Sequence, residues 1–599
     1  MVQIRRHIGL LISLAALGLL IGCSSGAPAE APTATATSAA QGVATPTATT
    51  VSALPPTPTP TPVVAQVQAT PTATPIPAPK KRTGGTVTIA QHWFTTTMDF
   101  GKSSSVATNV VGPITDYFLR SGPDAQIGDN RLGVLKSWVI SDDGKTLTWT
   151  LKPGILWQDG VEMTSADIKW TWERDAMGVG SKSPAAGMLI GTTQNNLDHV
   201  EIVDKYTAKI YLKHRDVVIM EHWGNIEGDQ EVIPAHWFEK NPVTQWDFLP
   251  LGSGPFKFVK FVPDQYVDYD ANLNYWQPER IPGYDKLRIM LVPEPSTRVA
   301  LLRSGQVDMA SLVAGHANSL KADGYGLEGP VYGGWTAAFF RGSYLSTNWG
   351  NNLLFRQAVT MGIDRENIAK QIFPTEMAVP FAGAPPFAPP MLGYTGKLPV
   401  YPYDQQKAKD LLKQSGYNGD KCYFFGATTS SALQPEQNEV SEAIAAYMKQ
   451  IGVNVEYKVM DSASRTKAQG SPKWPYWTPE TAGANCIMET QVFYNRPSTV
   501  NNMIAIMITV PAGGSSCACY WDSVYMDDLY LKAANTVSEA ERKVMFQALE
   551  KKLYDEYWTV PLVHRQLTFG MGPKVQRGTW APTYGAYIDL ALETVQLKP

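Results

Sequence analysis

Residues 24–79 constrain the fold of this chain most strongly, because they cannot contribute to a hydrophobic core. The segment contains 12 prolines and 13 threonines, has no aromatic residue, and carries one charge, at Glu30. Such a sequence buries too little apolar surface to offset the conformational entropy that is lost on folding. We therefore expect an extended, disordered tether, which would reach roughly 170 Å if it were fully polyproline-like.

A short apolar segment precedes this tether. Two arginines are followed by the apolar run Ile8–Ile21, which is too short to span a membrane comfortably and is typical of a secretory signal. The run leads into the letters LIGC, which resemble a bacterial lipobox and imply lipidation of Cys23 after cleavage. We expect a signal peptide at 1–22 and a lipidated tether at 23–82. The alternative is an ordinary signal peptide with a chance cysteine.

The body that follows, from about residue 83, is long enough for two to four folding units. The chain of 599 residues is 44% hydrophobic and 18% charged, which is typical of globular proteins. After residue 82 there are 46 basic and 53 acidic residues, which excludes bulk attraction to nucleic acid. A multi-span membrane protein is also excluded, because no apolar run of about 18 residues follows the N-terminal one.

Four cysteines lie in the last third of the chain: Cys422, Cys486, Cys517 and Cys519. Outside the cytoplasm, four such thiols predict two structural disulfides. Cys517 and Cys519 are too close in sequence to pair easily, so we expect each of them to bond to Cys422 or Cys486. A metal site is the weaker alternative, because the Cys-x-Cys pair has no nearby histidine.

Alternating apolar and polar residues predict several strands, and cap residues predict several helices. The strands are expected at 86–89, 146–151, 307–309 and 453–459. The helices are expected after the capping box of Thr164 and Asp167, from Ser296 to Gly305, from Asp404 to Gly416, up to Gly452, and over 538–557. Helices followed by strands favour α/β lobes with mixed sheets.

Eight groups of short motifs occur in order along the body. They are GGTVTIA at 84–90, LKSW at 135–138 with SDDGKT at 141–146, KPGI at 152–155 with WQDG at 157–160, TSAD at 164–167, GSGPF at 252–256, RSGQVD at 303–308, FRQAV at 355–359 with IDR at 363–365, and PLVH at 561–564. Together they resemble the family 5 extracellular solute-binding proteins of ABC importers, a group of oligopeptide, dipeptide and nickel binders. Each motif is weak alone, but their order is specific, and the match covers about 84–599.

The resemblance implies an α/β fold of the two-lobed periplasmic-binding-protein type, with an extra subdomain in the first lobe and a two-crossing hinge. The first lobe would span 83–345 with the subdomain at about 113–228, the second lobe 346–558, and 559–599 would return to the first lobe. A solute bound in the cleft between the lobes would favour closure. The protein would be an extracytoplasmic monomer that delivers this solute to an ABC permease with its ATPase subunits, with no nucleic-acid partner and no membrane contact besides the lipid anchor.

The segment around Phe493 bears on which solute is bound. In peptide-binding relatives, the matching segment carries an aspartate that pairs with the peptide α-ammonium. Here Tyr494 and Asn495 fit the pattern, but Phe493 stands at the aspartate position and Arg496 adds a positive charge. A buried ammonium without a counter-ion costs several kcal/mol, so a free peptide N-terminus needs another partner.

Two kinds of solute therefore stay open, with nickel chelates as a third alternative. Family membership favours peptides, with Asp99 or Asp522 as a substitute partner for the ammonium. The departure at Phe493 favours an oligosaccharide or another neutral or anionic solute, which the phenyl ring would stack against. In the first lobe, we expect His92, Trp93 and Asp99 to line the cleft. Phe387 lies in a proline-rich stretch that we expect to form a rim loop.

No catalytic signature occurs in the sequence: it has no nucleophile elbow, no zinc-protease motif and no phosphate loop. The histidines of the body are scattered without the spacing of metal ligands, and no cofactor is predicted. We expect a binding protein and not an enzyme. A surface adhesin or sensor remains a third possibility, which the absence of solute-induced closure would indicate.

Overall fold

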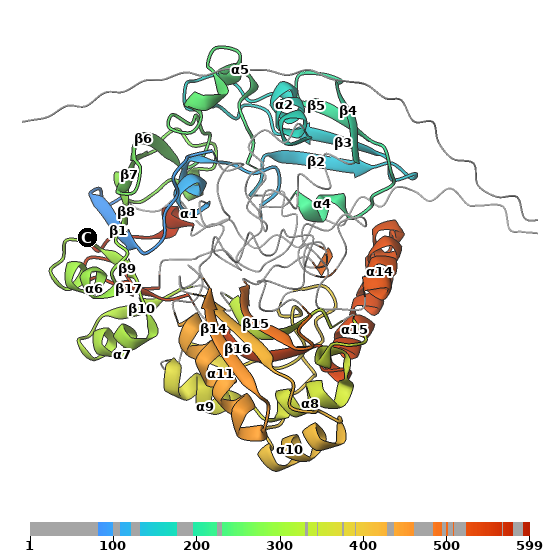
Figure 1. The fold of residues 1–599 in the computed structure, drawn as a ribbon. Coiled ribbons are helices and arrows are strands. Elements are labelled where there is room, and N and C mark those ends of the chain that lie inside the picture. Colours follow the sequence, from blue (N-terminus) through green and yellow to red (C-terminus); the bar gives the residue numbers. More distant parts are fainter. Residues whose placement is uncertain are drawn as a thin grey trace, which may run out of the picture. The chain divides into compact units, whose positions relative to one another are not determined.

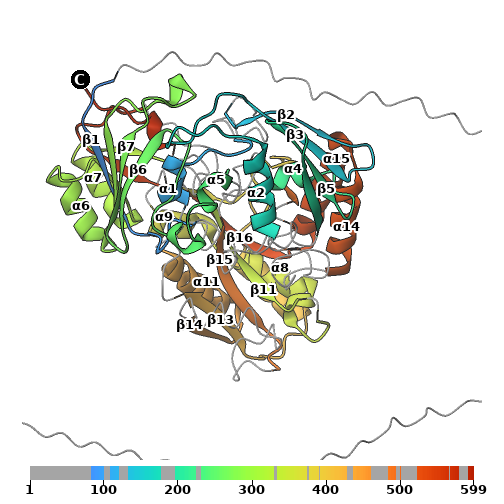
Figure 2. The same cartoon turned by 90° about the horizontal axis from the view of Figure 1, so that it is seen from above.

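The computed structural model describes most of the body in separate stretches. These are 82–99, 108–120, 132–176, 196–223, 231–329, 334–343, 345–373, 377–389, 391–427, 436–460, 483–493, 499–500, 503, 507, 523–565, 567–578 and 591–599. The described strands form three sheets, around which the helices are packed (Figures 1 and 2). The mixed α/β fold expected from the sequence is confirmed.

The first sheet has seven strands. In order across the sheet they are β10 (Gly326–Glu328), β17 (Phe569–Met571), β9 (Met309–Ser311), β1 (Thr86–Gln91), β8 (Lys286–Leu291), β7 (Tyr266–Ala271) and β6 (Phe256–Val262). β1 runs parallel to both β8 and β9. Two helices, α6 (Pro295–Arg303) and α7 (Ala314–Ala322), bury Leu302 and Leu320 against the face that carries Ala90 and Ala310.

The second sheet is a four-stranded antiparallel sheet. Its order is β2 (Leu135–Ile140), β3 (Thr146–Leu151), β5 (Thr207–Leu212) and β4 (Leu197–Ile202), and helix α2 (Ser165–Ala176) packs on it. Strand β3 alternates buried and half-buried residues as predicted. Its core is aromatic: Trp149 contacts Trp172 and Trp223, and the last two rings are stacked 4.0 Å apart. The sheet lies within the expected subdomain range of 113–228.

The third sheet has six strands. Its order is β12 (Ala378–Pro380), β16 (Thr559–Arg565), β11 (Gly334–Arg341), β15 (Ile487–Phe493), β13 (Cys422–Ala427) and β14 (Val455–Met460). One face packs on helices α8 (Leu353–Met361), α9 (Arg365–Ile372), α10 (Gln405–Gln414) and α11 (Gln437–Ile451). Part of the other face packs on α14 (Ser523–Asn535) and α15 (Glu539–Asp555).

Shorter helical turns complete the described elements. They are α1 (Thr108–Val111), α4 (Ile219–His222) and α5 (Ala235–Phe238), with 3-10 turns at 112–114, 243–245, 278–280, 349–351 and 592–594.

The predicted helix ends are mostly confirmed. Asp404 accepts a hydrogen bond from the Lys407 amide at the start of α10, and Gly452 ends α11 with a left-handed backbone, φ 105°. One cap prediction is wrong, because α6 begins at Pro295 and not after Ser296. Proline is suited to the first helical position, since its fixed φ matches the helix and its missing N–H is not needed there.

The disulfide pairing predicted from the sequence is also wrong. Cys422 bonds to Cys486, and their Cα atoms lie 4.5 Å apart. Strands β13 and β15 are parallel neighbours in which Tyr423 pairs with Ile487, so the two preceding residues stand side by side. The sequence separation of 64 residues hid this proximity. Cys23, Cys517 and Cys519 lie outside the described residues.

The six-stranded sheet extends beyond the expected second lobe, 346–558, at both ends. Strand β11 begins at Gly334, and β16 continues to Arg565. Both strands are buried along their whole length, so they show no alternation of apolar and polar residues that would mark them in the sequence.

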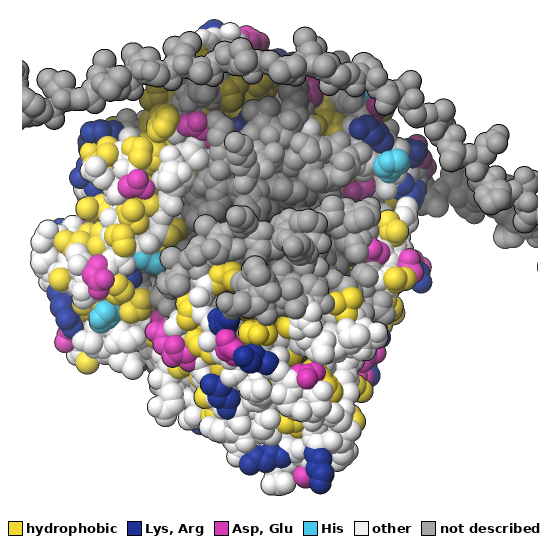
Figure 3. All heavy atoms as spheres, viewed as in Figure 1, with side chains coloured by type: hydrophobic (Ala, Val, Ile, Leu, Met, Phe, Trp, Pro, Cys, Tyr) yellow, Lys and Arg dark blue, Asp and Glu magenta, His cyan; other side chains and the backbone are white. Residues whose placement is uncertain are grey.

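The surface of the described part shows basic and acidic side chains interspersed over the region of the six-stranded sheet (Figure 3). Among the described helices, none is both long and apolar enough to cross a membrane.

Candidate ligand-binding site

The carboxyl ends of the parallel strands identify where a site can form. In α/β sheets, ligands bind at these ends, where helices begin. In the seven-stranded sheet, β8 and β9 are followed by α6 and α7. In the six-stranded sheet, β13 runs parallel to β14 and β15, and α11 follows β13 in the chain.

These edges of the two sheets meet at a junction. The Ala314 amide, at the start of α7, donates a hydrogen bond of 2.7 Å to Oε1 of Glu436, which directly precedes α11. The Ala314 side chain packs within the core of the six-stranded sheet. The chain also passes between the sheets here, from β10 to β11 and from β16 back to β17.

His92 and Trp93 follow β1 at this edge. The His92 ring is half-buried, and its Nδ1 lies 3.1 Å from the Ser311 hydroxyl at the end of β9. Trp93 is buried and packs edge-on against Phe569 of β17. The structure thus places His92 beside the junction and Trp93 in the core beneath it.

Asp99 is held away from solvent by an arginine. Its carboxylate accepts two hydrogen bonds from Nη2 of Arg174 on α2, at 2.6 and 2.7 Å, and both side chains are buried. A carboxylate in a buried pair already has a cation, and separating the two charges is costly. Asp522, the other acid considered for an ammonium, lies outside the described residues.

Phe387 is fully buried in the core cluster that contains Trp335 and Phe381. It supports the sheet from within this cluster. Phe493 ends β15, where its backbone pairs with Trp335 of β11. Residues 494–496, including Tyr494, Asn495 and Arg496, follow this strand end and lie outside the described residues.

The junction contains three polar residues that the sequence reasoning did not single out as site residues: Glu436, His564 and Arg565. Arg565 ends β16 between Gly334 and Ala378. Its Nη2 lies 3.8 Å from Oε2 of Glu436, and both residues are nearly buried. For His564 and Arg565, the signal in the sequence was two polar residues directly after the apolar letters PLV.

His564 stands in the same row of the sheet as Trp335 and Phe493. Its ring stacks on Phe381, with the centroids 4.0 Å apart. Burial lowers the pKa of His564 to about 4, so the imidazole is neutral at physiological pH.

A buried ion pair lies further along the same sheet. Arg341 of β11 pairs with Glu489 of β15, and Gln491 donates a hydrogen bond of 2.6 Å to the same carboxylate. It is a second buried ion pair, besides that of Asp99 and Arg174.

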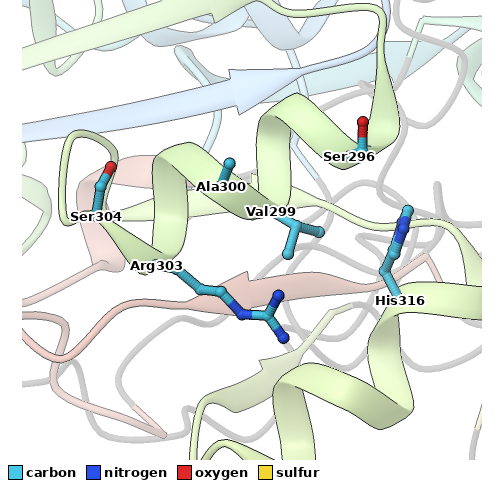
Figure 4. A pocket seen from close by; sticks show the side chains of 6 residues that line it. All are labelled: Ser296, Val299, Ala300, Arg303, Ser304 and His316. Carbon is cyan, nitrogen blue, oxygen red and sulfur yellow. The ribbon is translucent and has the colours of Figure 1, made fainter.

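A separate groove of about 480 Å³ lies along α6. It is lined by Ser296, Val299, Ala300, Arg303, Ser304 and His316 (Figure 4). Arg303 reaches towards α7, where it donates hydrogen bonds to Ser319 and Asp323. Within the described stretches, no group of three or more His, Cys, Asp or Glu side chains is arranged to hold a metal ion.

The sheets and the two connections between the larger ones form a two-lobed α/β fold. The sequence profile of the bacterial extracellular solute-binding proteins, family 5, matches residues 131–495, which is more than half of the chain. The chain therefore belongs to this family. Members of the family are the non-enzymatic solute-binding components of ABC importers, so the protein binds its solute without chemical change.

Individual relatives agree with this assignment. The chain is 24% identical over 450 residues to the glutathione-binding protein GsiB of Escherichia coli, covering 72% of this chain and 80% of that protein. It is 25% identical over 494 residues to heme-binding protein A of Haemophilus influenzae, covering 76% and 83%. In fold it is similar to the periplasmic binding protein DppA of Helicobacter pylori in complex with the peptide STSA, with a TM-score of 0.67, 22% identity, and coverage of 86% and 99%.

Proposed function

We propose that this protein is a lipid-anchored solute-binding protein that captures a peptide-like solute between its lobes and delivers it to an ABC permease. The observation that carries the proposal is the junction at which the carboxyl edges of both sheets meet. Of the similar proteins, GsiB is named for binding glutathione, and the DppA structure holds the peptide STSA.

In this proposal, the sheets define the extent of each lobe. The second lobe consists of about 334–565, and the rest of the body forms the first lobe with the four-stranded sheet as its extra subdomain. The two crossings, between β10 and β11 and between β16 and β17, then form the hinge. The solute contacts both lobes and favours the closed form by its greater affinity for it.

An oligosaccharide is the second candidate. It is favoured by Phe493, which stands where peptide-binding relatives place an aspartate, and by the pairing of Asp99 with Arg174. An ammonium would find no carboxylate at position 493 and one already paired with an arginine at Asp99, whereas a sugar ring needs no carboxylate.

Native mass spectrometry of the full chain, extracted in mild detergent without refolding, distinguishes the two solutes. A retained mass series that fits mixed short peptides supports the first candidate. A ladder of hexose or pentose units supports the second. If the protein is empty and neither a pool of di- to hexapeptides nor a pool of oligosaccharides raises its melting temperature, the proposed capture role is contradicted.

Anchoring by Cys23 is tested separately. Two or three acyl chains give lasting attachment, because each buried CH₂ contributes about 0.8 kcal/mol. The Cys23→Ala variant should therefore leave the membrane fraction and become soluble. Continued retention of this variant in the membrane fraction would contradict the lipid anchor but not the binding role.

A further inference from the structure

Arg565 differs from the other buried arginines of the body in its hydrogen bonding. Arg298 donates to the carbonyls of Ser311, Val292 and Pro293, and Arg356 donates to those of Glu556, Gly350 and Asn351. Arg565 is only 3% exposed, yet Nε, Nη1 and Nη2 all lack a hydrogen-bond acceptor in the described part of the chain.

Such a guanidinium is costly to bury. It presents five N–H donors in a fixed plane, and each donor that leaves water without finding an acceptor incurs a desolvation penalty. The nearest carboxylate oxygen, Oε2 of Glu436, is 3.8 Å away, which is beyond hydrogen-bond distance. The other oxygen of Glu436 accepts the Ala314 amide, so this carboxylate is already held at the start of α7.

The position of Arg565 points to a ligand as the missing acceptor. The residue ends β16 beside Gly334, the first residue of β11, and the next residue of β11, Trp335, pairs with Phe493. Arg565 thus stands two strands from the end of β15, and four residues before the chain re-enters the seven-stranded sheet at β17.

We infer that Arg565, oriented by Glu436, forms a subsite that takes a carboxylate of the solute. This inference rests on the proposed function and specifies the chemical class of solute. A planar guanidinium matches a carboxylate with two parallel hydrogen bonds, which a neutral group cannot reproduce. The negative charge of Glu436 repels a bound anion only weakly, because the Glu436 carboxylate lies at the N-terminal end of α7, where the helix dipole is positive.

The test compares Arg565→Gln with a matched control, Arg356→Gln. Both remove a nearly buried arginine from the same lobe, but only Arg356 has its donors satisfied by backbone carbonyls. We expect Arg356→Gln to lower the melting temperature and Arg565→Gln to leave it unchanged or raise it. Arg565→Lys, which keeps the charge and loses the planar fork, serves as a second variant.

Two probe pools measure the subsite by calorimetry: tripeptides with a free C-terminal carboxylate, and the same tripeptides amidated at the C-terminus. We expect the full-length wild type and Arg356→Gln to bind the amidated pool about 100-fold more weakly, as for the loss of one partner of a buried charge pair. Arg565→Gln should bind both pools equally weakly, and Arg565→Lys should discriminate less than wild type. Equal discrimination by wild type and Arg565→Gln would overturn the subsite.

Sodium acetate, compared with sodium chloride at equal ionic strength, provides a readout that does not need a peptide ligand. If wild type binds neither tripeptide pool, the peptide proposal fails, but the subsite still predicts that acetate raises the melting temperature of wild type and not that of Arg565→Gln. An equal effect of acetate on both proteins would overturn the subsite, whatever the pools show.

Discussion

At His564, strand β16 places an imidazole against the ring of Phe381 with almost no access to solvent. Charging this ring is unfavourable because burial removes the water that would solvate the imidazolium. The neighbouring Arg565 is a permanent cation in the same strand. Burial therefore keeps the His564 side chain neutral, and the Arg565 side chain makes no hydrogen bond within the described part of the chain. Neither property can be read from the residue types alone.

Acidification should destabilise the protein through His564. The folded-state pKa of about 4 lies below the usual 6.5, so between these values only the unfolded chain binds the proton. The unfolding free energy should fall by about 1.4 kcal/mol per pH unit from pH 6.5 down to about 4, with no further loss below that value. In urea denaturation across this range, His564→Gln should lose less stability than wild type. A curve for His564→Gln that runs parallel to that of wild type would contradict the assignment.

At the scale of single elements, the ends of helices and strands were set by local chemistry. Asp364 and Ser538 accept hydrogen bonds from backbone amides at the starts of α9 and α15, as side-chain oxygens do at helix N-caps. Gly452 ends α11 in a conformation that only glycine adopts without strain.

Two glycine substitutions should act in opposite directions. Alanine at Gly452 meets no steric conflict, since Leu412 is 3.6 Å from the new Cβ, but its φ of 105° should cost about 1–2 kcal/mol of unfolding free energy. Gly315 lies in α7 with open space around it, so Gly315→Ala should stabilise by up to about 1 kcal/mol. Chemical denaturation of both variants measures the difference, and equal effects would contradict the conformational argument.

The bond between Cys422 and Cys486 ties β13 to β15 inside the six-stranded sheet. By restricting the unfolded chain over a separation of 64 residues, it should contribute about 4 kcal/mol to the unfolding free energy. The double variant Cys422→Ala/Cys486→Ala should show this loss in denaturation experiments. As a control, reduction of wild type under denaturing conditions should give a similar value. An unchanged midpoint for the double variant would show that the bond adds nothing.

At the scale of the whole body, two sheets are connected twice and touch through Ala314 and Glu436. Two connections of this kind permit lobes to move as units about them. In the proposed function, the solute acts as an additional contact between the lobes. The solute-binding role of the family thus fits the topology of this chain, in which two connections join the two larger sheets.

Solute-induced closure should be measurable by small-angle scattering. The wild-type protein should have a smaller radius of gyration with its bound solute than after the solute is removed by partial unfolding and refolding. Arg565→Gln serves as a variant with weakened binding and should need more solute for the same change. If saturating solute leaves the radius unchanged, the protein binds without closing, which would favour a sensor or scaffold role.

The sequence alone determined the α/β class, most helix ends and the family, because caps and short motifs are local properties that neighbouring residues fix. It did not determine the partner of Cys422, the membership of β11 and β16 in the six-stranded sheet, or the pairing of Asp99 with Arg174. These depend on strand order and on contacts between residues far apart in the chain. Arg565 shows the difference most clearly, since its burial beside Glu436 arises only when β16 joins the six-stranded sheet on which α11 packs.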